Sequence, residues 1–339
     1  MSVKKTASMV LAILVVFMLN IVRAESNRCM SIQIGDYQSI ALRTDGTVVG
    51  TDEYLIDEMR DWRDIIAIDY GYSTLGLKSD GTVVCTPPAE WSAVLYDVER
   101  DIKNWRDIIA ISNGSTHSVG LRKDGTVMAT GENEFGECDV GGWKDIVGID
   151  AGMYHTVGLK RNGTVVATGD NEEGQCNVGS WKNVVAVTCR GDKTFGLLKD
   201  GTVVATGYNE DGQCDVTGWQ NIVEVIDCSD HTVGLVSDGT VVAVGDNEYG
   251  QCNVNDWRNI VFVAGDDEYT VGVKADGTVV AVGNNEYGRC NVNGWRNVVA
   301  VTCGFFHVVG LKNDGTAIAT GDNQYGQCNV SGWRNIRTK

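Results

Sequence analysis

Six short segments bring carboxylates and glycines together, a composition that could hold a metal ion or activate a water molecule. One of them, at residues 245–254, reads GDNEYGQCNV. Close variants occupy residues 131–140, 169–178, 207–216, 283–292 and 321–330. A catalytic loop is not normally needed six times, whereas Asn and Gly supply the left-handed backbone of tight turns. The pattern therefore predicts a structural turn, whose glutamates form an acidic arc: Glu134, Glu172, Glu210, Glu248 and Glu286.

Histidine, the commonest general base, also occurs at one repeated position of the sequence. The four histidines are His117, His155, His231 and His307, and each stands eight residues before a glycine of an Asp-Gly or Asn-Gly pair. Other copies of this position carry Gln38, Ser73, Lys193 and Tyr269. A metal site needs ligands within a few ångströms of one another, and these are distributed one to a repeat. We expect structural hydrogen bonds rather than metal binding.

Eleven cysteines divide into a regular and an irregular set. Six share one register, namely Cys138, Cys176, Cys214, Cys252, Cys290 and Cys328. Packed sheets lie about 10 Å apart, farther than the Cα separation that a disulfide bridges, so these six are expected to be buried small residues. The disulfide state of Cys189, Cys228 and Cys303 stays open. No catalytic triad, phosphate loop or C-x-x-C motif stands out, and we expect no enzyme, no cofactor and no metal site.

A repeat of 38 residues must position all of these side chains. Tryptophan opens W-[RKQ]-[DN]-[IV] at residues 62, 105, 143, 181, 219, 257, 295 and 333, with a first gap of 43 residues and six gaps of 38. Eight Asp-Gly or Asn-Gly pairs keep step with these segments, from Asp45-Gly46 to Asp314-Gly315. Such a pair between alternating apolar segments predicts a hairpin with a type I′ turn, which needs positive φ at both central residues.

One unit, residues 295–332, indicates the architecture. VVAV (298–301), HVVGLK (307–312) and TAIATG (316–321) read as antiparallel strands, and CNV (328–330) as a short fourth one. Units of three to four strands and about 40 residues are the size of propeller blades. The first unit lacks its tryptophan and the chain ends with one, so the tail can complete the first unit. The sequence predicts an all-β, closed β-propeller of eight blades, with seven as the alternative.

The expected boundaries follow the tryptophans. A signal peptide spans residues 1–24 and a single propeller domain spans residues 25–339. Units 1 to 8 are residues 30–61, 62–104, 105–142, 143–180, 181–218, 219–256, 257–294 and 295–332, followed by a closing segment at 333–339.

The repeats resemble a known family. ISNGSTHSVGL (111–121), IDAGMYHTVGL (149–159) and the ATGDNxYGQ segments are similar to the regulator of chromosome condensation (RCC1) repeat. The short units and the apolar N-terminus most resemble the secreted propeller-type β-lactamase inhibitory proteins of this kind, which implies a protein-binding loop face. The resemblance to nuclear guanine nucleotide exchange factors implies exchange activity, but the short units leave no room for the wedge that exchange uses. Both relatives have seven blades, so a count of eight departs from them.

Two segments interrupt the repeat. Residues 85–104 form an insertion with both prolines, in which Trp91, Leu95, Val98 and Ile102 recur at helical spacing. Unit 1 carries TDEYLIDEMRD in place of its third-to-fourth loop. Covering a blade edge and binding a partner are both open interpretations of the insertion.

The first-to-second loops vary most while their frame stays fixed, which is typical of binding loops on a rigid scaffold. With the third-to-fourth loops, they open on one face of a blade, and the Asp-Gly turns open on the other. Aromatic or apolar tips are expected to anchor a partner and acidic tips to attract it. We predict this set of partner-binding residues: Tyr37, Tyr72, Trp91, Met153, Tyr154, Asp192, Asp230, Asp267, Glu268, Phe305 and Phe306.

Lys4 and Lys5, an apolar run at 7–22 and Ala24 match a secretory signal peptide. The expected product is a secreted monomer without a membrane anchor. The formal net charge of the chain is −17, which disfavours nucleic acid as a partner. We expect a secreted, non-enzymatic binding protein whose partner is another protein, either basic or an extracellular enzyme that it could inhibit. A carbohydrate- or envelope-binding propeller is the alternative, and a nucleotide exchange factor a weaker one.

Overall fold

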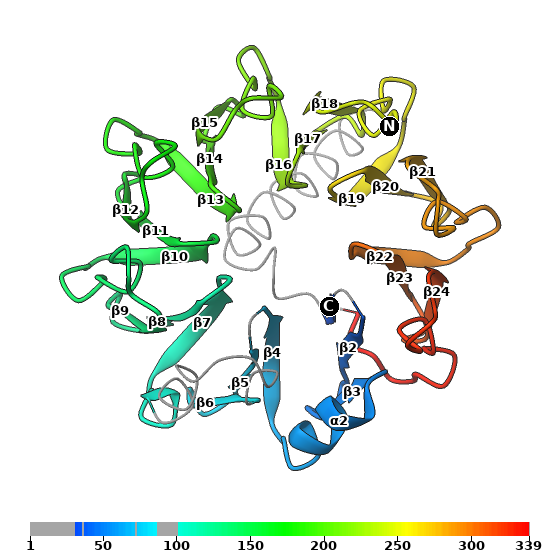
Figure 1. Ribbon diagram of the computed structural model, residues 1–339, viewed down its shortest axis with the longest axis horizontal. Coiled ribbons are helices and arrows are strands. Elements are labelled where there is room, and N and C mark those ends of the chain that lie inside the picture. The colour runs from blue at the N-terminus through cyan, green and yellow to red at the C-terminus, as the bar shows by residue number, and fades with distance from the viewer. Residues whose placement is uncertain (1–30, 36, 72, 87–100, 339) are drawn as a thin grey trace, which may run out of the picture.

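Eight three-stranded antiparallel sheets follow one another along the chain. The computed structural model describes residues 31–35, 37–71, 73–86 and 101–338. Figure 1 shows the eight sheets side by side around a common centre, as in a propeller. The predicted all-β class and the count of eight rather than seven units are confirmed.

Each sheet has three consecutive strands in spatial order. Units 1 to 4 contain β1 (Ile32–Ile34), β2 (Ser39–Leu42) and β3 (Val48–Gly50); β4 (Ile65–Tyr70), β5 (Thr74–Lys78) and β6 (Val83–Cys85); β7 (Ile108–Asn113), β8 (His117–Arg122) and β9 (Val127–Gly131); and β10 (Ile146–Ala151), β11 (His155–Lys160) and β12 (Val165–Gly169). Units 5 to 8 contain β13 (Val184–Arg190), β14 (Lys193–Leu198) and β15 (Val203–Gly207); β16 (Ile222–Asp227), β17 (His231–Val236) and β18 (Val241–Gly245); β19 (Ile260–Asp266), β20 (Tyr269–Lys274) and β21 (Val279–Gly283); and β22 (Val298–Cys303), β23 (His307–Lys312) and β24 (Ala317–Gly321).

The expected fourth strand at residues 328–330 is a turn instead. Its backbone groups bond locally, since the N–H of Cys328 donates to the Asn323 side chain and that of Val330 to the Cys328 carbonyl. The Trp333 N–H then donates to the carbonyl of Val330. A segment whose N–H groups are satisfied within its own turns has none left for a fourth ladder.

The eight hairpins are present, but their turn type differs from the prediction. The turn glycines have positive φ, for example 81° at Gly201, whereas the preceding aspartates do not. The Gly201 N–H donates to Leu198 and the Leu198 N–H to Thr202, which is a three-residue loop with a glycine bulge. The Asp200 carboxylate accepts hydrogen bonds from both the backbone N–H and the hydroxyl of Thr202. These two bonds fix the backbone of Asp200 at a negative φ.

The core lies between neighbouring sheets, and the repeat tryptophans contribute to it. Trp295 and Trp333 are buried, and each packs with residues of two successive sheets. A Cβ on Gly310 in β23 would lie 2.6 Å from the Trp295 ring. The recurrent glycine of the second strand is therefore required by the close approach of the indole.

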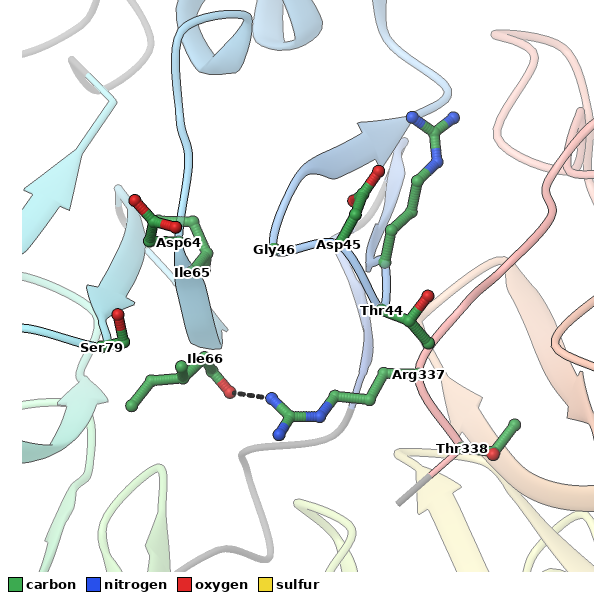
Figure 2. A pocket seen from close by; sticks show the side chains of 10 residues that line it. Thr44, Asp45, Gly46, Asp64, Ile65, Ile66, Ser79, Arg337 and Thr338 are labelled. Carbon is green, nitrogen blue, oxygen red and sulfur yellow. Dashed lines mark hydrogen bonds between the residues drawn. The ribbon is translucent and has the colours of Figure 1, made fainter.

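The C-terminal segment bonds to the first sheet. Ile336 pairs with Arg43 in an antiparallel bridge, the Thr44 N–H donates to Asn335 and the Arg337 N–H donates to Leu42. In unit 2 the Ser79 N–H donates to Asp64 in the same manner, so the tail occupies the place that a post-tryptophan segment takes in other units. Figure 2 shows Arg337 reaching the Ile66 carbonyl beside a hollow of about 500 Å³ between units 1 and 2.

The two interruptions differ in what the structure describes. Helix α2 (Glu53–Met59) replaces the third-to-fourth loop of unit 1, capped by Asp52 and anchored by Leu55 and Met59. The predicted helix of the insertion, with Trp91, lies outside the described residues except for its end, where residues 101 and 102 are helical and Ile102 is buried. In the described parts of the chain, no helix has the length and apolarity to cross a membrane.

Candidate binding face

The acidic, glycine-rich loops are turns that hydrogen-bond to themselves. In each of the six, the Asn side chain accepts from the N–H of the register cysteine, as Asn247 does from Cys252 at 2.8 Å. The buried Gln251 accepts from the N–H of Tyr249 and donates to Asp246. The recurrent polar residues of the motif thus maintain the turn, while the intervening Glu248 and Tyr249 remain exposed.

The histidines join neighbouring units. The Thr156 hydroxyl donates to the Glu137 carbonyl, so the His117 Nε2–H must be the donor in its 2.8 Å bond to Thr156. His155, His231 and His307 make the same contact with Thr194, Thr270 and Ser39 of the next unit. Burial lowers the pKa of His117, His231 and His307 to about 4. Among the described residues no three His, Cys, Asp or Glu side chains gather as metal ligands.

The six register cysteines are thiols, each pointing at a carbonyl of its own loop, as Cys252 Sγ does at Asp246. Burial raises the pKa of Cys138, Cys176 and Cys214 to about 12, and that of Cys252, Cys290 and Cys328 to about 11. They are therefore protonated and unreactive at neutral pH. Cys228 and Cys303 are thiols as well, and Cys189 is buried with its N–H bonded to Asp150.

The variable loops share one end of every sheet, which we call the loop face. His307 pairs with Gly321, so the first-to-second loop before His307 and the third-to-fourth loop after Gly321 open together. The opposite end, with the hairpin turns, is the turn face. Of the predicted site residues, Tyr72 and Trp91 lie outside the described residues, and the others lie on the loop face.

Aromatic side chains gather on the loop face over units 7, 8 and 1. Phe306 contacts Phe305, Tyr287 and Tyr37, with ring centroids 4.7, 5.2 and 5.5 Å apart, and Tyr37 meets Tyr325 edge-on at 5.0 Å. Tyr37 and Tyr325 remain 52% and 63% exposed. We call these five residues the aromatic cluster. It brings together three predicted residues, Tyr37, Phe305 and Phe306, with two that the sequence reasoning missed.

The missed residues, Tyr287 and Tyr325, occupy the variable position of the G-x-N-E-x-G turn. The same position carries Phe135, Glu173, Asp211 and Tyr249 in other units. Comparing that position across the six turns would have revealed aromatic residues in four units and acidic residues in the other two. Phe135 makes a further pair with Tyr154 at 5.4 Å, next to the exposed Met153 of unit 4.

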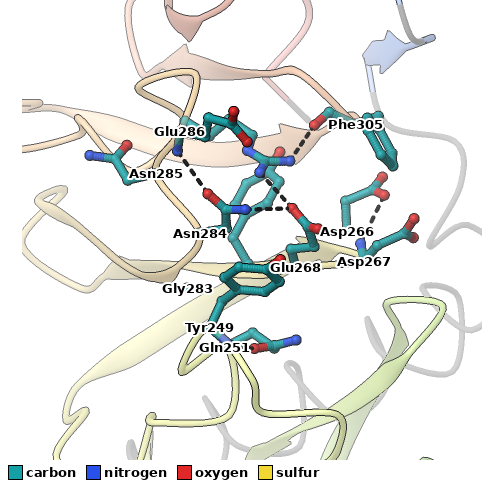
Figure 3. A network of polar contacts seen from close by, with 12 residues as sticks. Tyr249, Gln251, Asp266, Asp267, Glu268, Gly283, Asn284, Asn285, Glu286 and Phe305 are labelled. Atoms are coloured by element: carbon teal, nitrogen blue, oxygen red, sulfur yellow. Dashed lines mark hydrogen bonds and ion pairs between the residues drawn. The ribbon is translucent and has the colours of Figure 1, made fainter.

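One basic side chain fastens the loops beneath the cluster. Arg289 is 1% exposed and stands where other units have Gln or Glu. Its guanidinium donates to the Glu268 carboxylate at 2.8 Å and to the Phe305 carbonyl, and lies over the rings of Tyr269 and Tyr287. Figure 3 shows Asn284 joining this network by donating to Glu268. Arg289 therefore ties three loops of units 7 and 8 together.

The acidic tips have mixed roles. Glu268 is ion-paired with Arg289, whereas Asp230 is exposed. Burial raises the pKa of Asp192 and Asp230, and burial with the neighbouring Asp266 charge raises that of Asp267 to about 6. The loop face therefore becomes less negative as the pH falls through 6.

Two ion pairs lie beneath these tips, one of them buried and the other partly exposed. Arg190 of unit 5 reaches Asp266 of unit 7 at 2.9 Å, and Lys193 lies 3.5 Å from Asp227. Lys193 occupies the position that histidine has in four other units. Its ion pair with the buried Asp227 therefore replaces the neutral histidine–hydroxyl hydrogen bond between neighbouring units. The Lys193–Asp227 pair is buried and presents no charge to a partner, whereas the Arg190 side chain is 38% exposed.

The comparisons with known proteins agree with this architecture. The regulator of chromosome condensation (RCC1) repeat matches residues 108–137, 146–175, 229–251 and 298–327. No curated protein matches the chain significantly.

Several solved structures share the fold at low identity. Prp20p of Saccharomyces cerevisiae, described with its binding to Gsp1p and histones, is 17% identical over 70% of this chain and 76% of its own, with a TM-score of 0.51. The CRINKLY ectodomain of the Arabidopsis thaliana receptor kinase ACR4 is 18% identical over 75% and 93%, also at 0.51. The computationally designed protein Ika8 is 15% identical over 88% and 98%, again at 0.51.

Proposed function

We propose that this chain, in which four segments match the RCC1 repeat, is a secreted, non-enzymatic binding protein that engages a protein partner through its loop face. The aromatic cluster carries the proposal. Tyrosine and phenylalanine at loop tips, partly exposed yet fixed by mutual contact, are the anchors that protein interfaces use most. Turns without a binding role favour small polar residues at such positions.

The scaffold suits this role because it fixes the loops. The tips of units 7 and 8 are held by Arg289 from below, so the anchors lose little conformational freedom on binding. Prp20p, which shares the fold, is described with protein partners, Gsp1p and histones. That supports protein binding in general and leaves the partner of this chain to be identified.

The charge of the loop face defines the partner further. Glu134, Glu172, Glu210, Glu248 and Glu286 are all exposed on it, beside Asp230. A basic protein would be attracted by this arc, with the gain mainly in association rate. We infer an extracellular partner with a basic surface, and inhibition of an enzyme is one consequence that such binding could have.

The test compares crosslinked pull-downs from the native extracellular fluid. The bait is the mature chain, either unchanged or with Phe305→Ala and Phe306→Ala. We expect the double change to weaken capture of a specific protein by about 2 kcal/mol or more in binding free energy. A control with Lys199→Gln on the turn face should capture it normally. If the control loses the partner and the double variant keeps it, the loop face is the wrong surface.

Carbohydrate binding is the second candidate, favoured by the exposed Tyr37, Tyr249 and Tyr325 rings. A sugar ring stacks on an aromatic face without needing a basic partner. Glycan-array binding that disappears with Tyr325→Ala, together with no protein captured, would replace the protein-binding proposal.

Secretion rests on the N-terminal sequence. We expect the protein in the culture medium with Glu25 as its first residue. Finding it inside the cell with residues 1–24 retained would remove the extracellular partner and restore the exchange-factor alternative.

A further inference from the structure

The turn face has a composition opposite to that of the loop face. It comprises, in each unit, the four residues that end at the hairpin glycine and the four that follow a repeat tryptophan. Asp64 of the second group touches the turn glycine Gly46 of the first, so both groups share this end of the sheets. These segments hold 17 of the 28 Lys and Arg but only 10 of the 45 Asp and Glu. A chain of net charge −17 therefore carries one basic face.

Exposed aliphatic side chains occur on the same face. In seven sheets the register of the first strand shifts by one residue, as between Ile65 and Ala67. The extra residue of each bulge has no cross-strand partner. In units 4 and 6 this residue, Val147 or Val223, packs against a hydrophobic cluster, whereas in four other units it is exposed. Four of these are among the most exposed apolar residues that the structure describes: Ile66 at 43%, Ile109 at 49%, Val261 at 50% and Val299 at 38%.

The four residues form one arc. They belong to units 7, 8, 2 and 3, and unit 1 between them carries Arg337 at the corresponding position, bonded to the Ile66 carbonyl (Figure 2). Each of these four units has an exposed arginine three positions before its aliphatic residue: Arg63, Arg106, Arg258 and Arg296. The other exposed large apolar residues, such as Tyr325 and Met153, lie on the loop face or, like Tyr54, in α2.

We propose that the turn face is a docking surface for an anionic lipid bilayer, to which the protein binds peripherally. A row of exposed aliphatic side chains, each three residues after an exposed arginine, matches the interface of a membrane, where hydrocarbon lies beneath phosphate. Nucleic acid would use the arginines but has no hydrocarbon to receive Val261 or Ile109. A soluble protein would satisfy the aliphatic groups but does not require basic residues in seven of the eight units.

The hollow between units 1 and 2 does not form a separate anion-binding site. It is lined by Arg43 and Arg337 but also by Asp45 and Asp64, so its charges balance. The docking surface depends on the exposed arginines and the aliphatic arc together. It is independent of the loop-face proposal, because the two surfaces lie at opposite ends of the sheets.

The test is flotation of the mature chain with vesicles of phosphatidylcholine alone and of phosphatidylcholine with phosphatidylglycerol. We expect binding to the anionic vesicles to exceed binding to the neutral ones by about tenfold or more, and to weaken with salt. Equal binding to both vesicles, or binding to neither, overturns the proposal. Binding to duplex DNA in place of the anionic vesicles overturns it as well.

Two variants separate charge from insertion. The first variant combines Arg106→Gln, Arg258→Gln and Arg296→Gln. It should lower binding to anionic vesicles about tenfold or more. Glutamine fits this position, because unit 6 has Gln220 there. A second variant replaces the four aliphatic residues by threonine, which is also branched at Cβ: Ile66→Thr, Ile109→Thr, Val261→Thr and Val299→Thr. This variant should lose the vesicle binding that survives at high salt. The Phe305→Ala, Phe306→Ala variant should float normally. If it alone loses the vesicles, the membrane contact belongs to the loop face and the proposal is wrong.

Discussion

At the residue scale, Arg289 shows how one substitution in a repeat register builds a site. Its counterparts Gln175, Gln213, Gln251 and Gln327 each accept or donate within their own loop. Arg289 instead extends to Glu268 and Phe305. The repeat pattern drew attention to what the units share, and so this departure was missed although the sequence displays it.

Replacing Arg289 by Gln should lower the free energy of unfolding by about 1–2 kcal/mol. The loss stays at the low end for a buried pair because Glu268 is 29% exposed and remains solvated. Urea unfolding measures it. The double variant Arg289→Gln, Glu268→Gln should cost less than the sum of the two single changes, and strict additivity would show that the ion pair contributes nothing.

The buried histidines predict a pH dependence of stability. The pKa of His117, His231 and His307 is about 4 in the folded chain and near 6.5 in the unfolded one. Between these values the unfolded chain binds more protons, so stability is lost as the pH falls from 6.5 toward 4. Asp267, whose pKa is raised to about 6, acts in the opposite sense and offsets about one histidine.

The variant His117→Gln isolates one of these protons, and Gln38 shows that the register accepts glutamine. We expect the slope of unfolding free energy against pH to fall by about 1.4 kcal/mol per pH unit inside that window. Urea titrations across the window give the slope. An unchanged slope would mean that the pKa of His117 is the same in the folded and the unfolded chain.

At the element scale, the sequence located all eight hairpins but not their turn type. Asp-Gly fits both a two-residue type I′ turn and a three-residue loop with a glycine bulge, and only the loop length separates them. The Thr two residues after each Asp was the missing clue, since its hydroxyl bonds that carboxylate. The bulges of the first strands were also beyond sequence reasoning, because a run such as Ile65-Ile66-Ala67 reads as an uninterrupted strand.

The turn glycines provide an element-scale test. Gly201→Ala should lower stability by about 1–2 kcal/mol, because its φ of 81° is a left-handed conformation and the new Cβ would lie 3.0 Å from Asn221 Cα. Gly179→Ala is the matched control, since a Cβ there meets nothing within 4 Å. Thermal melts of both variants should differ clearly. Equal melting of the two would contradict the assigned turn geometry.

At the scale of the whole molecule, the eight units differ less in frame than in surface. The frame residues, such as the repeat tryptophans and the second-strand glycines of units 2 to 8, recur from unit to unit. The units differ mainly on their two faces. Aromatic and acidic groups lie on the loop face, and basic and aliphatic groups lie on the turn face. Three of the five aromatic residues, Tyr37, Phe305 and Phe306, were predictable because they interrupt the repeat, whereas the assembly of all five into one cluster depends on units 1 and 8 being neighbours.

That neighbourhood depends on the C-terminal segment. Trp333 and Ile336 are buried in one cluster with Ile32 and Ala41 of the first sheet. His307 of unit 8 also bonds Ser39 of unit 1 at 2.7 Å. A chain without residues 333–339 would expose the edges of both sheets and lose the cluster between them.

We therefore expect deletion of residues 333–339 to lower stability by more than about 4 kcal/mol, the scale of losing a buried tryptophan. The control lacks only Thr338 and Lys339, and Thr338 is exposed, so this shorter truncation should melt like the full chain. Calorimetry of the three chains distinguishes the cases. If the longer deletion also melts like the full chain, units 1 and 8 are not held together by this segment. The aromatic cluster, which needs Tyr37 beside Phe306, would then have to be supported in another way.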